Sequence, residues 1–392
     1  FTLVTVSFAG YSASDCLGQV DGSGNCDLAV GFPDSINNGD VAPNSFGFNW
    51  IYSSDIDTEN HRLFVTDRQS RILIFNLDAN NILVDREADY ILGQVSFTAT
   101  GATGPTQNGL STPLSVAYDS NHERLFVYDG YNGAGSRVLV YDLSSGIANN
   151  MNASYVLGQD DFVSAAAVTD QKSTGHTNAT SVVNGNGIEY DSSSDLLYVS
   201  GGPTASRVII FDVRPAGSPN RTLCGEVTTG IATGMNASCV LGQPDFATST
   251  VGTTQSKFSR ASDIALDTEN NLVFIVDGTN RRVMIFDISG GLSNGMNASY
   301  VLGQEDFTST ASSLSQNGMV APRGVHFDPD NNHLFVSDQN RVLVYDISNG
   351  ITNGMNAFFI LGADDFTSTL TGTSSETFSS PIGINKNGTT LY

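Results

Sequence analysis

A short sequence signature recurs six times along the chain and constrains the fold more than any other feature. The tripeptide Leu-Gly-Gln, once with Ala in place of Gln, begins at Leu17, Leu92, Leu157, Leu241, Leu302 and Leu361. The longer stretches around it, such as 137–162, 282–307 and 341–366, are close variants of one another. Self-similarity at a spacing of several tens of residues indicates an array of structural repeats. The 392 residues are therefore predicted to form one body of six units.

Each full unit predicts four short β-strands. In the second unit these lie at 113–119, 124–129, 137–143 and 155–159, where apolar residues alternate with polar ones between turns rich in Asn, Asp, Gly and Ser. No stretch has the length and the 3.6-residue period of a surface helix. The chain is therefore predicted to be all-β. Its antiparallel four-stranded units are expected at about 46–94, 113–159, 184–243, 261–304 and 322–362.

The two ends of the chain each carry half of a unit. Residues 381–386, an Asn387-Gly388 turn and residues 389–392 predict a first strand, a hairpin turn and the start of a second strand. Residues 1–8 predict another strand, and 16–19 repeat the fourth-strand signature. A sixth unit built from 381–392 plus 1–19 closes the array and leaves only short, protected edges. The predicted fold is a six-bladed β-propeller of four-stranded antiparallel blades, closed by a blade that the two termini share.

The stretch PRGVHFDPDNNHLFVSDQNRVLVYD (322–346) resembles the NHL repeat. The trailing Leu-Gly-Gln-x-Asp-Phe is similar to the version found in secreted bacterial and archaeal propellers, and the resemblance covers nearly the whole chain. It implies the fold and little about function, because propellers host enzymes, binding modules and structural proteins alike. Related six-bladed folds include lactonases that use carboxylates in the central channel and a zinc-dependent amidating lyase.

The chain is strongly acidic, with 17 Lys and Arg against 40 Asp and Glu and a formal net charge of −23. Phosphate backbones are bound by clustered Lys and Arg, so nucleic acid is excluded as a partner. No apolar run reaches the roughly 18 residues that span a bilayer, so we expect no membrane span. A charge of this size suits a surface that faces salt or the outside of a cell.

Four cysteines fall into two local pairs, Cys16 with Cys26 and Cys224 with Cys239. Two short disulfide loops explain this pattern, whereas a zinc site would need Cys-x-x-Cys spacing or nearby His, and neither is present. Asn-x-Ser/Thr sequons occur at Asn152, Asn178, Asn220, Asn236, Asn297 and Asn387. Three of them recur inside Met-Asn-Ala-Ser, either as glycosylation sites or as copied turn chemistry. Together these features favour an extracellular or cell-surface location.

The two faces of a propeller carry different loops. Turns between the first and second strands, and between the third and fourth, lie on one face. The blade-to-blade connections lie on the opposite face, which we call the loop face. These connections are 20–49, 95–112, 160–183, 244–260, 305–321 and 363–380. All sequons except Asn178 fall away from the loop face. Glycans would therefore leave the loop face open for protein or glycan partners.

An arginine precedes each third strand. The five are Arg71, Arg137, Arg207, Arg282 and Arg341. One interpretation is a ring of guanidinium groups that binds a carboxylate or sulfate ligand. The competing interpretation is a structural pair with the Asp that ends the preceding strand, at Asp67, Asp129, Asp277 and Asp338. The third unit has Gly201 at this place, so Arg207 is expected to be available for a ligand.

The first strands of a propeller line its central channel, and here the six units differ. Polar side chains expected in the channel are Asp55, Glu189, Asp263, His326 and Asn385. Oxygen ligands of this kind suit a divalent ion, above all calcium. The alternative is that they are solvated groups in a watery channel. His61, His122 and His333 fall in separate first-to-second turns, too far apart to share a metal, which disfavours the lyase.

The sequence supports two functions of different classes. The first is a non-catalytic extracellular or cell-surface propeller that binds proteins or glycans through the loop face, or assembles with copies of itself. The absence of a Gly-x-Ser-x-Gly elbow or a phosphate-binding loop favours this hypothesis. The alternative is a calcium-assisted hydrolase or lactonase with its site in the channel. A small-ligand sensor would use Trp50, the single tryptophan, to line a pocket.

Overall fold

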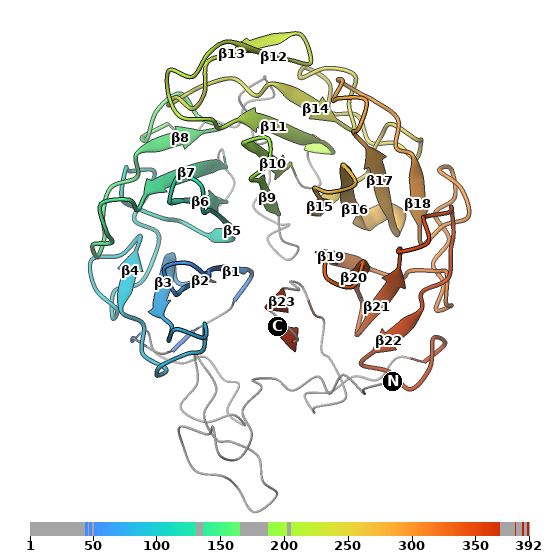
Figure 1. Ribbon diagram of the computed structural model, residues 1–392, viewed down its shortest axis with the longest axis horizontal. Coiled ribbons are helices and arrows are strands. Elements are labelled where there is room, and N and C mark those ends of the chain that lie inside the picture. Colours follow the sequence, from blue (N-terminus) through green and yellow to red (C-terminus); the bar gives the residue numbers. More distant parts are fainter. Residues whose placement is uncertain are drawn as a thin grey trace, which may run out of the picture.

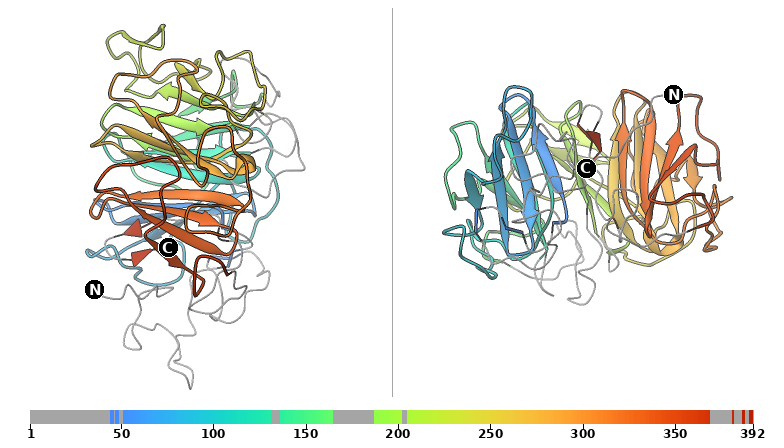
Figure 2. Two further views of the ribbon diagram at one scale, coloured as in Figure 1. Left: turned by 90° about the vertical axis from the view of Figure 1, so that its right-hand side faces the viewer. Right: turned by 90° about the horizontal axis from the view of Figure 1, so that it is seen from below.

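Five four-stranded antiparallel sheets stand around a central axis (Figure 1). The computed structural model describes residues 44–45, 47–48, 51–130, 136–164, 187–201, 205–368, 381, 386–387 and 390–391. Figure 2 shows the resulting disc from the side, with the strands of each blade running between its two faces. The described part of the chain is thus an all-β propeller, as predicted.

The five blades follow one another in chain order. They are β1–β4 (Ser54–Asp57, Arg62–Asp67, Arg71–Asn76, Tyr90–Leu92), β5–β8 (Pro113–Asp119, Arg124–Asp129, Arg137–Asp142, Tyr155–Leu157), β9, β10, β11 and β14 (Ile188–Asp191, Leu196–Ser200, Val208–Asp212, Cys239–Leu241), β15–β18 (Ala261–Asp267, Leu272–Asp277, Arg282–Asp287, Tyr300–Leu302) and β19–β22 (Pro322–Asp328, His333–Asp338, Arg341–Asp346, Phe359–Leu361). A short 3-10 helix, η1 (Gly278–Asn280), joins β16 to β17. Each outermost strand is only three residues long.

The hydrophobic core lies between neighbouring blades. Four of the five buried clusters each combine residues of neighbouring blades, and the fifth belongs to the first blade. Aromatic rings meet across these junctions. The ring centroids of Phe64 and Tyr118 are 5.4 Å apart, and those of Phe274 and Phe327 are 5.6 Å apart. Burial of this apolar surface, at about 25 cal/mol per Å², is what holds one blade against the next.

The glycine of each Leu-Gly-Gln signature is required by the backbone. Gly93, Gly158, Gly242, Gly303 and Gly362 all have φ between 82° and 85°. Only glycine adopts this conformation without strain. The junction is also tight, because a Cβ added at Gly242 would lie 2.1 Å from the Phe258 ring. The glycine of the signature therefore marks where the outer strand ends. At this point the strand end packs against the blade-to-blade connection that follows it.

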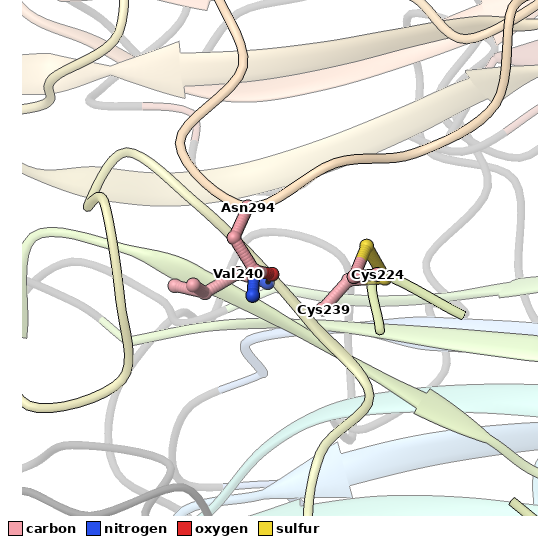
Figure 3. The surroundings of a disulfide bond; sticks show 4 residues. All are labelled: Cys224, Cys239, Val240 and Asn294. Atoms are coloured by element: carbon pink, nitrogen blue, oxygen red, sulfur yellow. Dashed lines mark hydrogen bonds between the residues drawn. A yellow bond between two sulfur atoms is a disulfide. The ribbon is translucent and has the colours of Figure 1, made fainter. Parts of the chain in front are cut away.

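Four of the five described outer strands, β4, β8, β14 and β18, are each covered by the next blade through a turn that we call the hook. The hooks are the pairs Asn149-Asn150, Thr233-Gly234, Asn294-Gly295 and Asn353-Gly354, which precede the fourth strands. The backbone N–H of Gly295 donates to the carbonyl of Val240 (3.0 Å), and the N–H of Val240 donates to Oδ1 of Asn294 (2.9 Å; Figure 3). The hook thus supplies hydrogen-bond partners for the N–H and the carbonyl of Val240, at the middle of a strand edge that has no neighbouring strand.

The C-terminal end forms the short hairpin that the sequence predicts. Strands β23 (Lys386–Asn387) and β24 (Thr390–Leu391) pair antiparallel, with Asn387 opposite Thr390. Asn387 is thus paired in a strand, whereas the sequence placed it in the turn. Figure 1 shows β23 near the axis, in the sector between the last and first blades. Residues 1–19, with the predicted strand 1–8 and the Cys16–Cys26 pair, lie outside the described residues.

The insertion in the third blade carries a hairpin that sequence reasoning missed. Strands β12 (Arg221–Leu223) and β13 (Glu226–Thr228) pair with each other between β11 and β14. Cys224, in the turn of this hairpin, forms the predicted disulfide with Cys239 on β14 (Figure 3). Arg214 and Arg221 also bind Asp212, with closest distances of 2.7 Å. The insertion is therefore fixed to its blade by a disulfide and by an ion-pair network.

Removing this disulfide is expected to destabilise the protein. A bridge across a sequence separation of 15 residues restricts the unfolded chain, so Cys224→Ala/Cys239→Ala should lower the free energy of unfolding by about 2–3 kcal/mol. Urea unfolding of the wild type and the double variant, with and without reductant, measures the loss. If reductant destabilises both proteins equally, the Cys224–Cys239 bridge is not the source of this stabilisation.

Candidate functional site

Buried Arg–Asp pairs underlie the loop face. Asp277 lies directly opposite Arg282 in the β16–β17 register, and Nε of Arg282 is 2.9 Å from Oδ2 of Asp277. Both side chains are fully buried. The same pair forms between Asp67 and Arg71 (2.7 Å), Asp129 and Arg137 (3.2 Å), and Asp338 and Arg341 (2.9 Å). These four arginines are structural and are not exposed to a ligand.

The same arginines anchor the blade-to-blade connections. Nη1 of Arg282 donates to the carbonyl of Phe307, and Nη1 of Arg341 donates to that of Phe366. These Phe rings pack partly buried against the junction cores. The preceding Asp306 accepts the backbone N–H groups of Thr308 and Ser309, both at 2.8 Å. The recurring Asp-Phe pair is therefore a loop anchor.

The glutamine of Leu-Gly-Gln holds the same connections at a second point, a few residues beyond the Asp-Phe pair. Nε2 of Gln243 donates to the carbonyl of Thr250 (2.9 Å), and Nε2 of Gln304 donates to that of Ala311 (2.8 Å). Gln94 makes the equivalent bond to Gly101. Each of these connections is thus fixed at two or more points, and only the residues between the anchors project freely.

Arg207 differs from the other four, but it is also buried. Its exposed fraction is 1%, and Nη1 donates to the carbonyl of Phe246 (2.5 Å). Gly201 replaces the partner Asp, and a Cβ there would lie 2.8 Å from the Cβ of Ala205. The role of Arg207 as a ligand-binding residue remains a prediction.

Apolar side chains project from three successive connections of the loop face. Val95, Val163 and Val251 are exposed by 75%, 68% and 61%. Val251 directly follows Thr250, the residue that Gln243 holds. A valine side chain that stays exposed to water buries little apolar surface on folding, so these three side chains do not stabilise the core. Apolar side chains on anchored loops are a surface that a partner can bury without reordering the loops.

Four sequon asparagines are described, and all four are exposed. They are Asn152, Asn220, Asn236 and Asn297. In the Met-Asn-Ala-Ser copies the Ala is buried, with exposed fractions of 1% at Ala153 and 0% at Ala237. Asn178 lies outside the described residues, and only the backbone of Asn387 is described.

Two of the predicted channel carboxylates take part in joining the blades. Oδ2 of Asp55 accepts the N–H of Tyr118 from the next blade (2.6 Å), and Oδ2 of Asp263 accepts the N–H of Val325 (2.9 Å). Burial raises the pKa of Asp55 to about 6 and that of Asp263 to about 7. These hydrogen bonds favour the charged form and lower both pKa values, but the effect of burial is larger. Each of these residues has a structural role whether or not an ion is present.

Glu189 is the predicted channel carboxylate that accepts no such hydrogen bond among the described residues. Burial, together with the negative charges of Asp55 and Asp263, raises its pKa well above the ordinary value. Glu189 is therefore close enough to both aspartates to be repelled by their charges. Within the described ranges, however, they do not form a compact group of ligand atoms. His326 lies partly buried on β19, and Asn385 falls outside the described residues.

The compact group of possible metal ligands in the described chain lies elsewhere. One ligand atom from each of Asp119, His122 and Asp195 lies within 4.8 Å of the other two. Arg124 already binds Asp119, with Nη2 2.5 Å from Oδ2, and Tyr190 donates to Asp195 (2.6 Å). This group is a polar clasp between the second and third blades. A cation there would have to compete with the Arg124 guanidinium.

Sequence reasoning missed this clasp because it joins two blades. Asp195 precedes the second strand of its blade, as His61 and Glu123 do in theirs, and all three have positive φ. The neighbouring pair of blades has a similar contact, in which Nη2 of Arg62 is 3.8 Å from Glu123. Comparing the repeats in register, one blade against the next, would have predicted both contacts.

The sheet topology and the repeated anchors define this protein as a β-propeller. No protein-family model and no curated protein matches its sequence. Among solved structures, a chain in the crystal structure of a nidogen/laminin complex is similar over 84% of this chain and 83% of that chain, with 13% identity and a TM-score of 0.42. A chain in the structure of U3-55K is similar over 77% and 62%, with 11% identity and a TM-score of 0.44. These similarities concern the fold alone.

None of the helices in the described residues is both long enough and apolar enough to cross a membrane.

Proposed function

We propose that this protein is a non-catalytic propeller, extracellular or on the cell surface, that binds other proteins or glycans through its loop face. A second copy of the chain is included among these partners. The observation that carries the proposal is that each exposed valine directly follows a residue that fixes its loop: Gln94, Phe162 or Thr250. Preordered loops lose little conformational entropy on binding, so apolar contact there is favourable.

The finer features of this proposal come from the sequence. We propose an NHL-type ring of six blades, closed by residues 381–392 and 1–19, with glycans on the face opposite the loops. The position of β23 between the last and first blades supports a sixth blade. The disulfide and the exposed sequon asparagines support a secreted glycoprotein. Intact-mass measurement before and after glycosidase treatment of protein from its native source tests the glycans.

The matched variants Val163→Ser and Val227→Ser test the loop face. The two valines are almost equally exposed, by 68% and 63%, but Val227 lies in the insertion on the opposite face. Binding to a glycan array and self-association in the analytical ultracentrifuge are measured for both variants and the wild type. We expect Val163→Ser to weaken binding about three- to tenfold, the effect of losing one buried apolar side chain, and Val227→Ser to leave it unchanged. Equal effects of the two variants would contradict the proposal.

A second candidate function is a calcium-assisted hydrolase or lactonase in the channel. The repulsion of Glu189 by Asp55 and Asp263 favours it, because a divalent cation would relieve that repulsion. Asp55, Glu189, Asp263, His326 and Asn385 are the proposed ligands. Calorimetric titration of the protein with Ca²⁺ should then give heat that Glu189→Gln reduces. No heat at either protein would eliminate this candidate.

A further inference from the structure

Two arginines lie close together where the fourth blade contacts the fifth. Arg260 ends the connection 244–260, and Arg323 lies two residues beyond the connection 305–321, so both stand at the loop face. Arg260 directly precedes β15, and Arg323 is the second residue of β19, the neighbouring innermost strand (Figure 1). Both side chains are only partly buried, so both are accessible from solvent.

The path of the Arg260 side chain brings the two positive charges together. A Cβ added at Gly278 would lie 3.8 Å from Cδ of Arg260 and 3.0 Å from the carbonyl oxygen of Pro322. The Arg260 side chain therefore extends past Gly278 to the start of β19, where Arg323 directly follows Pro322. Burial and the like charge of Arg323 lower the pKa of Arg260 to about 10. At neutral pH both guanidinium groups are charged and repel each other.

Hydrogen bonds fix the backbone at both arginines. The N–H of Arg260 donates to Oδ1 of Asp277, and its carbonyl accepts the N–H of Gly278, both at 2.9 Å. The carbonyl of Arg323 accepts a hydrogen bond from the Ser262 hydroxyl of the fourth blade (3.3 Å). A ligand that binds between the two guanidinium groups therefore has to order two side chains and no backbone.

The fold does not need an arginine at either position. In the second blade the corresponding residues are Thr112 and Leu114, because Thr112 likewise donates its N–H to the Asp that ends the second strand. Leu114 is buried and packs in the core between blades. In the fourth blade the position of Arg323 holds the buried Ser262. The arginine pair is thus specific to one junction and is not part of the repeated structural set.

Most other arginines of the chain have a carboxylate partner. Such ion pairs are formed by Arg62, Arg71, Arg124, Arg137, Arg214, Arg221, Arg282 and Arg341. The guanidinium of Arg323 forms no ion pair and no hydrogen bond with any residue that the structure describes. Two cations held side by side favour a bound anion, because the anion attracts both of them and offsets their repulsion.

We infer that Arg260 and Arg323 together bind one oxyanion, the carboxylate or sulfate group of a small acidic sugar. Guanidinium groups offer paired N–H donors that match the oxygens of such groups. The net charge of −23 opposes a large polyanion more than a ligand with one or two charges. The inference rests on the proposed function and deepens it, because it gives the chemistry of a glycan that the loop face would bind.

Thermal unfolding at constant ionic strength tests this site. The probes are sodium sulfate, glucuronate and N-acetylglucosamine 6-sulfate, with sodium chloride, glucose and N-acetylglucosamine as controls. The rise of the melting temperature with probe concentration gives the dissociation constant. We expect Arg260→Gln and Arg323→Gln each to raise it about tenfold or more, the effect of losing a charged donor. Arg323→Lys should raise it less, because lysine keeps the charge and loses the paired donors.

Arg281→Gln is the matched control. Arg281 lies in the turn between β16 and β17 of the fourth blade, and its Nη1 donates to the carbonyl of Thr310 (3.1 Å). This variant removes the same charge from another point, so it should bind the probes like the wild type. It also corrects for the general stabilisation of proteins by sulfate, which all variants share. In chloride, Arg323→Gln should melt no lower than the wild type, because the substitution relieves repulsion.

The outcomes separate the site from its ligand. No specific effect of any probe on the wild type, or equal weakening by Arg281→Gln and Arg323→Gln, would overturn the inference. Tighter binding of the two acidic sugars than of sulfate assigns the site to a glycan. Equal binding of all three assigns it to a free anion and overturns the sugar part of the inference. The Val163→Ser comparison scores loop-face binding through an uncharged residue, so the two proposals fail separately.

Discussion

Asp277→Ala is expected to lower the free energy of unfolding by about 3–5 kcal/mol. The substitution leaves the Arg282 guanidinium fully buried without its carboxylate. It also removes the acceptor of the Ser259 and Arg260 backbone N–H groups, both 2.9 Å from Oδ1. Because a domain is stable by only about 5–15 kcal/mol, a loss of this size is readily measured by urea unfolding.

Two further variants check the cause of this loss. Asp287 ends the next strand of the same blade and is exposed, so Asp287→Ala should change stability by no more than about 0.5 kcal/mol. Asp277→Ala/Arg282→Met removes the unpaired charge as well and should recover part of the stability. A double variant less stable than Asp277→Ala would show that the buried charge is not the main cost.

Asp263→Asn is expected to stabilise the protein at pH 8, on the order of 4 kcal/mol, and to have little effect at pH 4. The folded pKa of Asp263 is about 7, above its ordinary value of 3.8. Between these values the folded protein binds a proton that the unfolded chain has lost, so this group costs stability as the pH rises. Asparagine keeps a carbonyl to accept the N–H of Val325 and carries no charge.

The measurement is the melting temperature of the variant minus that of the wild type, from pH 4 to pH 9. We expect this difference to grow up to about pH 7 and then level off. Asp287→Asn is the control, because hydrogen bonds from Ser289 lower the pKa of Asp287 and the sign of its pH dependence is opposite. A difference for Asp263→Asn that does not vary with pH would contradict the assigned pKa shift.

Much of the fold could be predicted because the repeated residues have structural roles. The glycine of Leu-Gly-Gln fixes a backbone angle, its glutamine holds a loop, and the Arg before each third strand binds a buried Asp. Such requirements recur in most blades, with Gly201 and the Leu-Gly-Ala variant as exceptions, so they are visible in one sequence. The β12–β13 hairpin was missed because it occurs once, inside the insertion.

The candidate site could be predicted only in part, because its residues differ from blade to blade. The sequence placed Asp55, Glu189 and Asp263 in the channel, but it did not show that Asp55 and Asp263 accept N–H groups of the next blade. It predicted Arg207 as a ligand-binding residue because its Asp is missing, and this remains a prediction, but it did not show that Arg207 is buried and donates to the Phe246 carbonyl. Contacts between blades depend on how neighbouring units are packed, which the sequence of one unit does not contain.

Because each hook reaches back to the blade before it, the propeller has a polarity. Proteolytic cleavage at Asn294-Gly295 would leave the inner strands of its own blade paired and would expose the edge of the preceding one. Cleavage in the hook of one blade should therefore first destabilise the outer strand of the blade that precedes it in the chain.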